Sequence, residues 1–174
     1  WYLLDTVPNT FAAGKQHDVP LMIGMTEADI SPIINQYKLI PNIKTGKSPM
    51  YLYLWKHVPT GWRMDGVKAY HSLDKGYVFG TPWTQTLGNY ERYAKPAGAT
   101  QKDPGGDEHD EGVTEFALET WAQFAATGDP NLPSNPHPRL GRLETWPPYE
   151  PGTEKYLDIK SPTEVKSGFS KLDV

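Results

Sequence analysis

The sequence has no cysteine, no excess of positive charge and no long apolar run, and each absence excludes a class of protein. Without cysteine there is no disulfide framework, no Cys-ligated zinc and no thiol nucleophile, although this absence does not identify a compartment. The 17 Lys and Arg residues are outnumbered by 21 Asp and Glu, which argues against a nucleic-acid-binding protein. No stretch approaches the roughly 18 consecutive apolar residues that cross a bilayer, so we expect no membrane span.

Aliphatic residues are also few, but aromatic residues are plentiful. Leu, Ile, Val and Phe make up about a fifth of the 174 residues, near the low edge for a globular chain, whereas six Trp and ten Tyr supply large side chains for a core. The 16 Gly and 17 Pro predict extensive turns and loops. The start, Trp1-Tyr2-Leu3-Leu4-Asp5, has neither an initiator Met nor a leader-like segment. We therefore expect a chain that enters a domain in the middle.

Local patterns predict a layered α/β arrangement. Residues 19–25 and 50–55 are short, nearly continuous apolar runs, which are typical of strands buried on both faces of a parallel sheet. Residues 113–127 place apolar side chains at helical spacing, and residues 156–159 alternate as in a short strand. Residues 56–76 are expected to form a long loop.

Acidic and histidine side chains follow the first two predicted strands. Glu27 and Asp29 come after the first strand, and His57 and His71 come after the second. In open α/β sheets, functional sites gather beyond the carboxyl ends of the strands. A carboxylate that orients an imidazole, and an imidazole that accepts a proton from a nucleophile, are two of the three parts of a hydrolytic triad.

The third part, a nucleophile, is not found in the sequence. In α/β-hydrolases the chain order is Ser, then Asp or Glu, then His, and here the acid does precede the histidine. However, the sequence contains no G-x-S-x-G elbow and no His-Gly-Gly-Gly oxyanion motif; the nearest match to the elbow, Gly168–Leu172, lacks the final Gly and follows the histidines.

Several stretches, in the right order, resemble the C-terminal part of type-B carboxylesterases, the family that includes cholinesterases. Asp29 matches the position of the family acid, which is usually Glu, within a motif that begins at Gly24. His71 matches the family histidine, although Ser72 replaces the Gly that usually follows, while Asp74 and the Tyr-Val-Phe-Gly ending agree. The stretches that carry the resemblance are residues 11–24, 24–29, 50–57, 69–80, 120–131 and 146–149.

The resemblance implies that residues 1–174 form the C-terminal portion of an α/β-hydrolase fold, with parallel strands, flanking helices and long loops. It implies hydrolysis of carboxylic esters, with His71 as general base and Asp29 as the acid that orients it. The nucleophilic Ser would come from an N-terminal part of the same enzyme, the substrate would be a small-molecule ester, and no cofactor or metal is implied. The alternative is a catalytically silent, cholinesterase-like binding or adhesion module.

Two further questions concern the acid and the interval after it. Glu27 is the reserve candidate for the acid. Asp29 and His71 are only 42 positions apart, whereas the family places a long helical stretch between them. Either this region is shorter than in the family, or a segment is omitted between Ile30 and Lys44.

Other conspicuous residues have simple structural interpretations. Trp55 is expected to be a core residue and Trp62 to anchor a loop, rather than either of them lining a substrate pocket. The run Asp107–Glu111 contains metal-binding residue types, but adjacent charges beside glycines are usually a solvated run. His17, His57 and His137 are expected at the surface.

Overall fold

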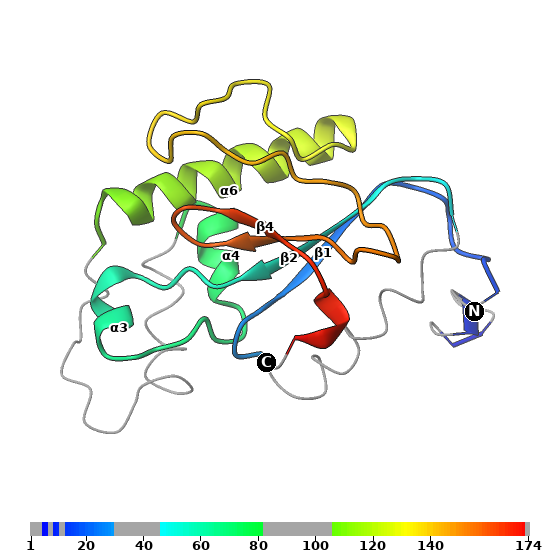
Figure 1. Cartoon of the computed structure of the whole chain (residues 1–174), viewed down its shortest axis with the longest axis horizontal. Helices are drawn as coiled ribbons and strands as arrows, with labels where there is room; N and C mark the ends of the chain where they lie inside the picture. Colours follow the sequence, from blue (N-terminus) through cyan, green and yellow to red (C-terminus); the bar gives the residue numbers. More distant parts are fainter. Residues whose placement is uncertain (1–4, 7–8, 11–12, 30–45, 82–105, 173–174) are drawn as a thin grey trace.

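A four-stranded sheet lies at the centre of the protein, as seen in a computed structural model that describes residues 5–6, 9–10, 13–29, 46–81 and 106–172. The order is β1 (Leu21–Thr26), β2 (Met50–Trp55), β3 (Tyr156–Ile159) and β4 (Glu164–Lys166). The first three strands are parallel, and β4 pairs antiparallel with β3. Figure 1 shows the strands side by side, with the carboxyl ends of the parallel strands at one edge.

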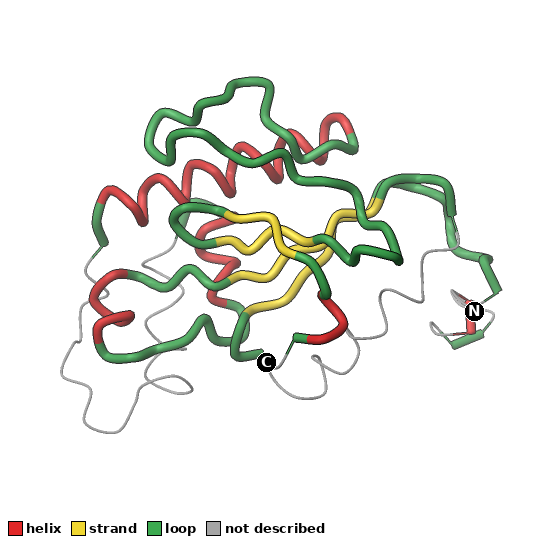
Figure 2. The backbone as a smooth tube through the Cα atoms, viewed as in Figure 1, coloured by secondary structure: helices red, strands yellow, loops and turns green. Residues whose placement is uncertain are grey.

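Helices lie beside the sheet. The longest, α6 (Glu108–Thr127), runs across one face, and α4 (Leu73–Val78) packs against it (Figures 1 and 2). The short α3 (Thr60–Met64) follows β2, and a 3-10 turn, η3 (Phe169–Lys171), lies near the C-terminus. Together with the parallel strands, these helices confirm the predicted α/β arrangement.

The core has two parts, because successive side chains of a strand point to opposite faces of the sheet. Tyr51 and Trp55 of β2 join a cluster that includes Phe116 of α6. The intervening Leu52 and Leu54 belong to the second cluster, on the other face. Burial on both faces explains why β2 is apolar along its whole length.

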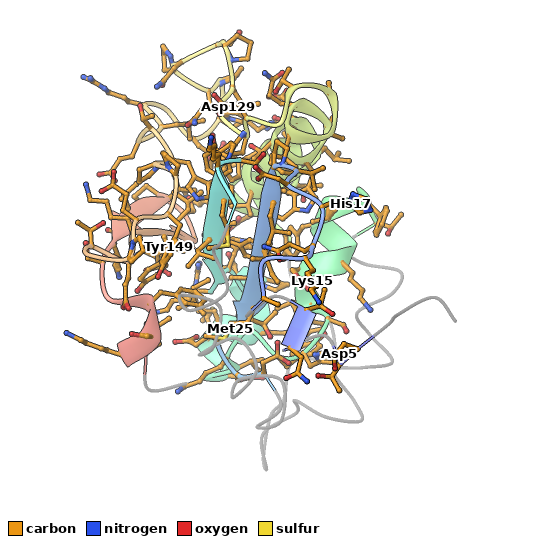
Figure 3. The ribbon with its side chains drawn as sticks, turned by 90° about the vertical axis from the view of Figure 1, so that its right-hand side faces the viewer. Asp5, Lys15, His17, Met25, Asp129 and Tyr149 are labelled. Atoms are coloured by element: carbon orange, nitrogen blue, oxygen red, sulfur yellow. The ribbon has the colours of Figure 1, made fainter. Side chains whose placement is uncertain are left out.

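The second cluster is completed by residues from outside the sheet's centre. Figure 3 labels two of its members, Met25 on β1 and Tyr149 in the loop before β3. Phe169 of η3 lies edge-on to Tyr156 of β3, with ring centroids 5.4 Å apart. The C-terminal turn thereby covers part of the face opposite α6.

Helix α6 begins five residues earlier than the predicted start at residue 113. Asp107 is its N-cap, accepting hydrogen bonds from the backbone N–H groups of His109 and Asp110, while the Asp110 side chain accepts from the N–H of Asp107. This reciprocal capping box satisfies N–H groups that a helix start leaves unpaired. Gly128, with φ of 77°, ends the helix in the left-handed conformation that glycine adopts most easily.

The predicted strands at 50–55 and 156–159 are confirmed, and the first strand spans 21–26 rather than 19–25. The predicted loop over 56–76 is wrong in part, because it contains α3 and all but the last two residues of α4. Trp62, which is fully buried, fixes the first of these helices against the core. The proposed omission between Ile30 and Lys44 falls outside the described residues.

Candidate active site

A single backbone bridge joins the loop after β1 to the segment that follows α3. Ala28 and Tyr70 form a parallel β-bridge, and the N–H of Ala28 donates to the carbonyl of Ala69 at 2.8 Å. The next residue on each segment is Asp29 on one side and His71 on the other. The bridge therefore places these two residues beside each other at the carboxyl edge of the parallel strands.

The side chains of Asp29 and His71 meet directly. The His71 Nδ1 and Asp29 Oδ1 atoms are 2.6 Å apart. Because a carboxylate can only accept, Nδ1 carries the proton in this hydrogen bond, and Nε2 is left as the acceptor of the neutral ring. The Asp29 side chain is 6% exposed, whereas the His71 side chain is 48% exposed. No hydrogen bond joins Nε2 to any described residue.

The backbone turns sharply just after His71. Ser72, the N-cap of α4, has φ of 71° and ψ of 9°, in the left-handed region. Residues other than glycine rarely adopt this conformation because their Cβ is crowded. This explains, in backbone terms, why a Gly at this position suits the motif, and why Ser72 carries a small conformational cost here.

A second carboxyl group lies close to the pair. Asp74 accepts a hydrogen bond from the Tyr53 hydroxyl at 3.3 Å. Burial raises the pKa of Asp74, and the nearby charge of Asp29 acts in the same direction, against the lowering effect of the Tyr53 hydrogen bond. The site thus holds a second carboxyl group whose burial disfavours its charged form.

Glu27, the reserve acid, points to a different partner. Its carboxylate lies 4.0 Å from the Lys56 ammonium group, with both side chains partly exposed. Its N–H donates to the carbonyl of Trp55, so its backbone extends the contact between the ends of β1 and β2. Asp29, not Glu27, is the carboxylate that contacts His71.

The prediction that His57 and His137 lie at the surface is wrong, whereas His17 is exposed (Figure 3). His57 Nε2 is 2.6 Å from Asp110 Oδ1, and both side chains are fully buried. His137 is held by its Nδ1, which accepts from the backbone N–H groups of Arg139 and Leu140. Both histidines are buried because the fold supplies a specific partner, which is how buried polar groups are normally accommodated.

The run Asp107–Glu111 is the first turn of a helix rather than a solvated loop, because Asp107 caps it and Asp110 is buried. Among the described residues, no group of three or more His, Asp or Glu side chains is arranged to hold a metal ion. Trp55 is fully buried in the core, as expected, whereas Trp62, which was expected to anchor a loop, is fully buried on helix α3. No helix in the described ranges has the length and apolar character needed to cross a membrane.

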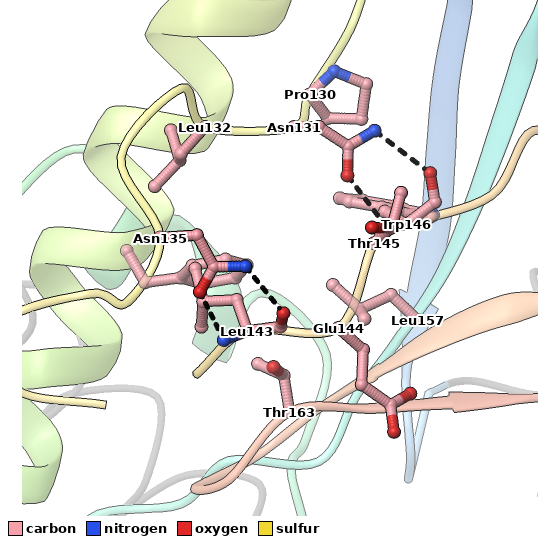
Figure 4. Close-up of a pocket in the computed structure, with 11 residues that line it drawn as sticks. Pro130, Asn131, Leu132, Asn135, Leu143, Glu144, Thr145, Trp146, Leu157 and Thr163 are labelled. Atoms are coloured by element: carbon pink, nitrogen blue, oxygen red, sulfur yellow. Dashed lines mark hydrogen bonds between the residues drawn. The ribbon is translucent and has the colours of Figure 1, made fainter. Parts of the chain in front are cut away.

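A small cavity of about 60 Å³ lies away from these residues, between α6 and the loop that leads to β3. Two asparagines brace its wall: Asn131 exchanges hydrogen bonds with the backbone of Trp146, and Asn135 does the same with Leu143 (Figure 4). The cavity has room for a few water molecules only, and neither Asp29 nor His71 lines it.

Parallel strands that carry an acid and a histidine at their carboxyl edge are the arrangement of the α/β-hydrolase fold. A family model described as "Carboxylesterase family" matches residues 28–174. The chain therefore belongs to the carboxylesterase family, and its sheet and helices are part of an α/β-hydrolase fold.

Three curated relatives are similar to this chain. It is 28% identical over 138 residues to carboxylesterase 3B of Mus musculus, a match that covers 76% of this chain and 22% of the relative. It is 29% identical over 121 residues to carboxylesterase 4A of Bos taurus, covering 67% and 17%. For carboxylesterase 3 of Homo sapiens the identity is 27% over 120 residues, covering 67% and 18%. The chain spans about a fifth of the length of these relatives.

Proposed function

We propose that this chain supplies the histidine and the acid of a serine esterase that hydrolyses carboxylic esters. His71 is the general base, Asp29 orients it, and the nucleophilic serine is contributed by sequence outside these 174 residues, in an N-terminal part of the same enzyme. The sequence itself has no G-x-S-x-G elbow, and the chain spans about a fifth of the carboxylesterases that it resembles.

The observation that carries the proposal is the geometry of the Asp29–His71 pair. The 2.6 Å hydrogen bond to Nδ1 fixes the tautomer and the orientation of the ring. Since the Asp29 side chain is almost fully buried while half of the His71 ring is exposed, the charge is shielded from water and the basic nitrogen is accessible. A group that only stabilised the fold would not need this asymmetry.

The reaction then follows the usual course of acyl transfer. As the serine oxygen attacks the ester carbonyl, Nε2 of His71 takes the hydroxyl proton, and Asp29 stabilises the resulting imidazolium. His71 gives that proton to the departing alkoxide, which leaves as an alcohol, and the serine is acylated. A water molecule then attacks the acylated serine, again with His71 taking and returning the proton, which releases the carboxylic acid and restores the serine.

The test is His71→Ala in the complete protein, assayed on a panel of simple carboxylic esters. We expect kcat to fall by about 10⁴-fold or more, because the proton acceptor is removed. Circular dichroism should be unchanged, since the His71 ring is half exposed.

His17→Ala is the matched control, because His17 is an exposed histidine that is not part of the Asp29–His71 pair. It should leave turnover unchanged. Normal turnover by His71→Ala would contradict the proposal. A complete protein that hydrolyses no ester would instead favour the silent binding module.

A further inference from the structure

The buried His57–Asp110 pair holds two elements together at the start of the segment that carries His71. His57 lies two residues after the end of β2, and its N–H donates to the carbonyl of Ile159, the last residue of β3. Its Nε2 donates to Oδ1 of Asp110, in the first turn of α6, at 2.6 Å with both side chains fully buried. The pair thus ties the sheet to the N-terminus of α6.

The Asp110 carboxylate also holds the beginning of α3. Its Oδ2 accepts from the backbone N–H of Asp107 at 3.0 Å and from that of Thr60 at 3.5 Å. The Thr60 hydroxyl in turn donates to Asp107 at 2.6 Å. Removal of the Asp110 charge would therefore loosen α3 as well as His57.

The far end of the same segment returns to His57. The rings of His57 and Tyr77, which belongs to α4, pack edge to face with centroids 5.2 Å apart and an interplanar angle of 89°. Tyr77 also lies against Trp55 of β2, at 5.1 Å. The segment that carries His71 is consequently held near its start by Asp110, through the Thr60 N–H, and at its far end by the contact of Tyr77 with the His57 ring.

We infer that His57 and Asp110 are positioning residues for His71. They fix the two ends of the segment that presents His71 to Asp29, so the 2.6 Å hydrogen bond of the exposed pair depends on the buried pair. This inference rests on the proposed function for its kinetic consequence, but its structural consequence can be measured independently. Displacement of a reacting group by about 1 Å can cost as much as about 100-fold in rate.

The experiment compares His57→Leu with His57→Gln in the complete protein. A Gln amide can donate to Asp110 as the imidazole Nε2 does, whereas Leu leaves that carboxylate without its partner. The first readout is the low-field proton NMR signal of the His71 Nδ1–H, assigned by its absence in Asp29→Asn. The second is the separation of kcat from KM on a carboxylic ester.

We expect the low-field signal to shift or vanish in His57→Leu, with kcat lowered by about 10- to 100-fold and KM within about twofold. In His57→Gln, the low-field signal and kcat should both stay close to those of the native protein. The control is His137→Leu, which removes another buried histidine, one that bonds the backbone of Arg139 and Leu140. It should lower stability without moving the His71 signal.

An unshifted His71 signal in folded His57→Leu would overturn the inference, whatever the loss of stability. If that variant fails to fold, Asp110→Asn decides the question, because it conserves volume while removing the charge; an unchanged signal there overturns the inference equally. If the complete protein hydrolyses no ester, the proposed function fails, and the NMR signal still tests the dependence of one pair on the other.

Discussion

Two His–Asp pairs in this protein have the same hydrogen-bond length and opposite surroundings. His57 and Asp110 are fully buried, whereas the ring of His71, bonded to Asp29, is 48% exposed. His57 uses Nε2, and its Nδ1 is enclosed without a hydrogen-bond partner among the described residues. His71 uses Nδ1, which leaves Nε2 outside this hydrogen bond on a ring that is half exposed. The contact alone does not distinguish the two histidines; the exposure of the ring does, and the proposed general base is the exposed one.

The largest expected effect is the loss of the acid from the exposed pair. Asp29→Asn should lower kcat for ester hydrolysis in the complete protein by about 10⁴-fold, because the amide no longer stabilises the imidazolium or favours the required tautomer. Steady-state kinetics check this.

Glu27→Gln is the matched control, since Glu27 lies on the same loop but contacts Lys56 across 4.0 Å. It should change kcat by less than about twofold, because exposed ion pairs contribute little. A large fall in kcat for Glu27→Gln, with little change for Asp29→Asn, would show that Glu27 rather than Asp29 is the acid.

Breaking the buried pair should act on stability. Asp110→Ala removes the partner of a fully buried imidazole and should lower the free energy of unfolding by about 3–5 kcal/mol. Urea unfolding followed by Trp fluorescence measures it. Glu115→Ala on the same helix removes only the exposed contact with Arg139 and should have little effect; a loss of similar size there would place the effect in the helix rather than in the pair.

Asp74, beside the exposed pair, and Asp107, beside the buried pair, should make the free energy of unfolding depend on pH in opposite directions. Burial raises the pKa of Asp74, so its contribution is fully present below the unfolded value of about 3.9 and is lost as pH rises through the folded value. Burial also acts to raise the pKa of Asp107, but hydrogen bonds from Thr60 and from two backbone N–H groups lower it overall. Its contribution is therefore present above about pH 3.9 and lost as pH falls.

Unfolding curves at several pH values, compared with Asp74→Asn and Asp107→Asn, test this pair of slopes. The free energy of unfolding of the native protein minus that of Asp74→Asn should fall as pH rises. The free energy of unfolding of the native protein minus that of Asp107→Asn should fall as pH falls. Slopes of the same sign would show that the two carboxyl groups are not in different environments.

The sheet was predictable because its strands carry their own signal. Residues 50–55 are apolar throughout, as burial on both faces requires, and the strand has these bounds. The edge strand Glu164–Lys166 has three partly exposed residues, too few for a pattern. The early start of α6 was missed because Asp107 and Asp110 are typical of a solvated run, although their spacing also fits a capping box.

The site was predictable only in part. The order of acid and histidine, together with a family resemblance, singled out Asp29 and His71, and the structure places them in contact; their catalytic roles stay a prediction. The burial of His57 was not predictable, since its partner Asp110 lies 53 positions away. No local pattern encodes such a pairing, which arises when α6 packs against the sheet.

The Ala28–Tyr70 bridge has a consequence for how this region can change during evolution. Asp29 and His71 each directly follow a bridged residue. Their contact therefore depends on the bridge and on the one residue after it in each segment, and not on the number of residues between the two segments. A change in chain length within that interval leaves the meeting intact only where β2 and the His57–Asp110 pair stay in place. A single residue added directly after Ala28 or Tyr70 would put the wrong side chain opposite its partner.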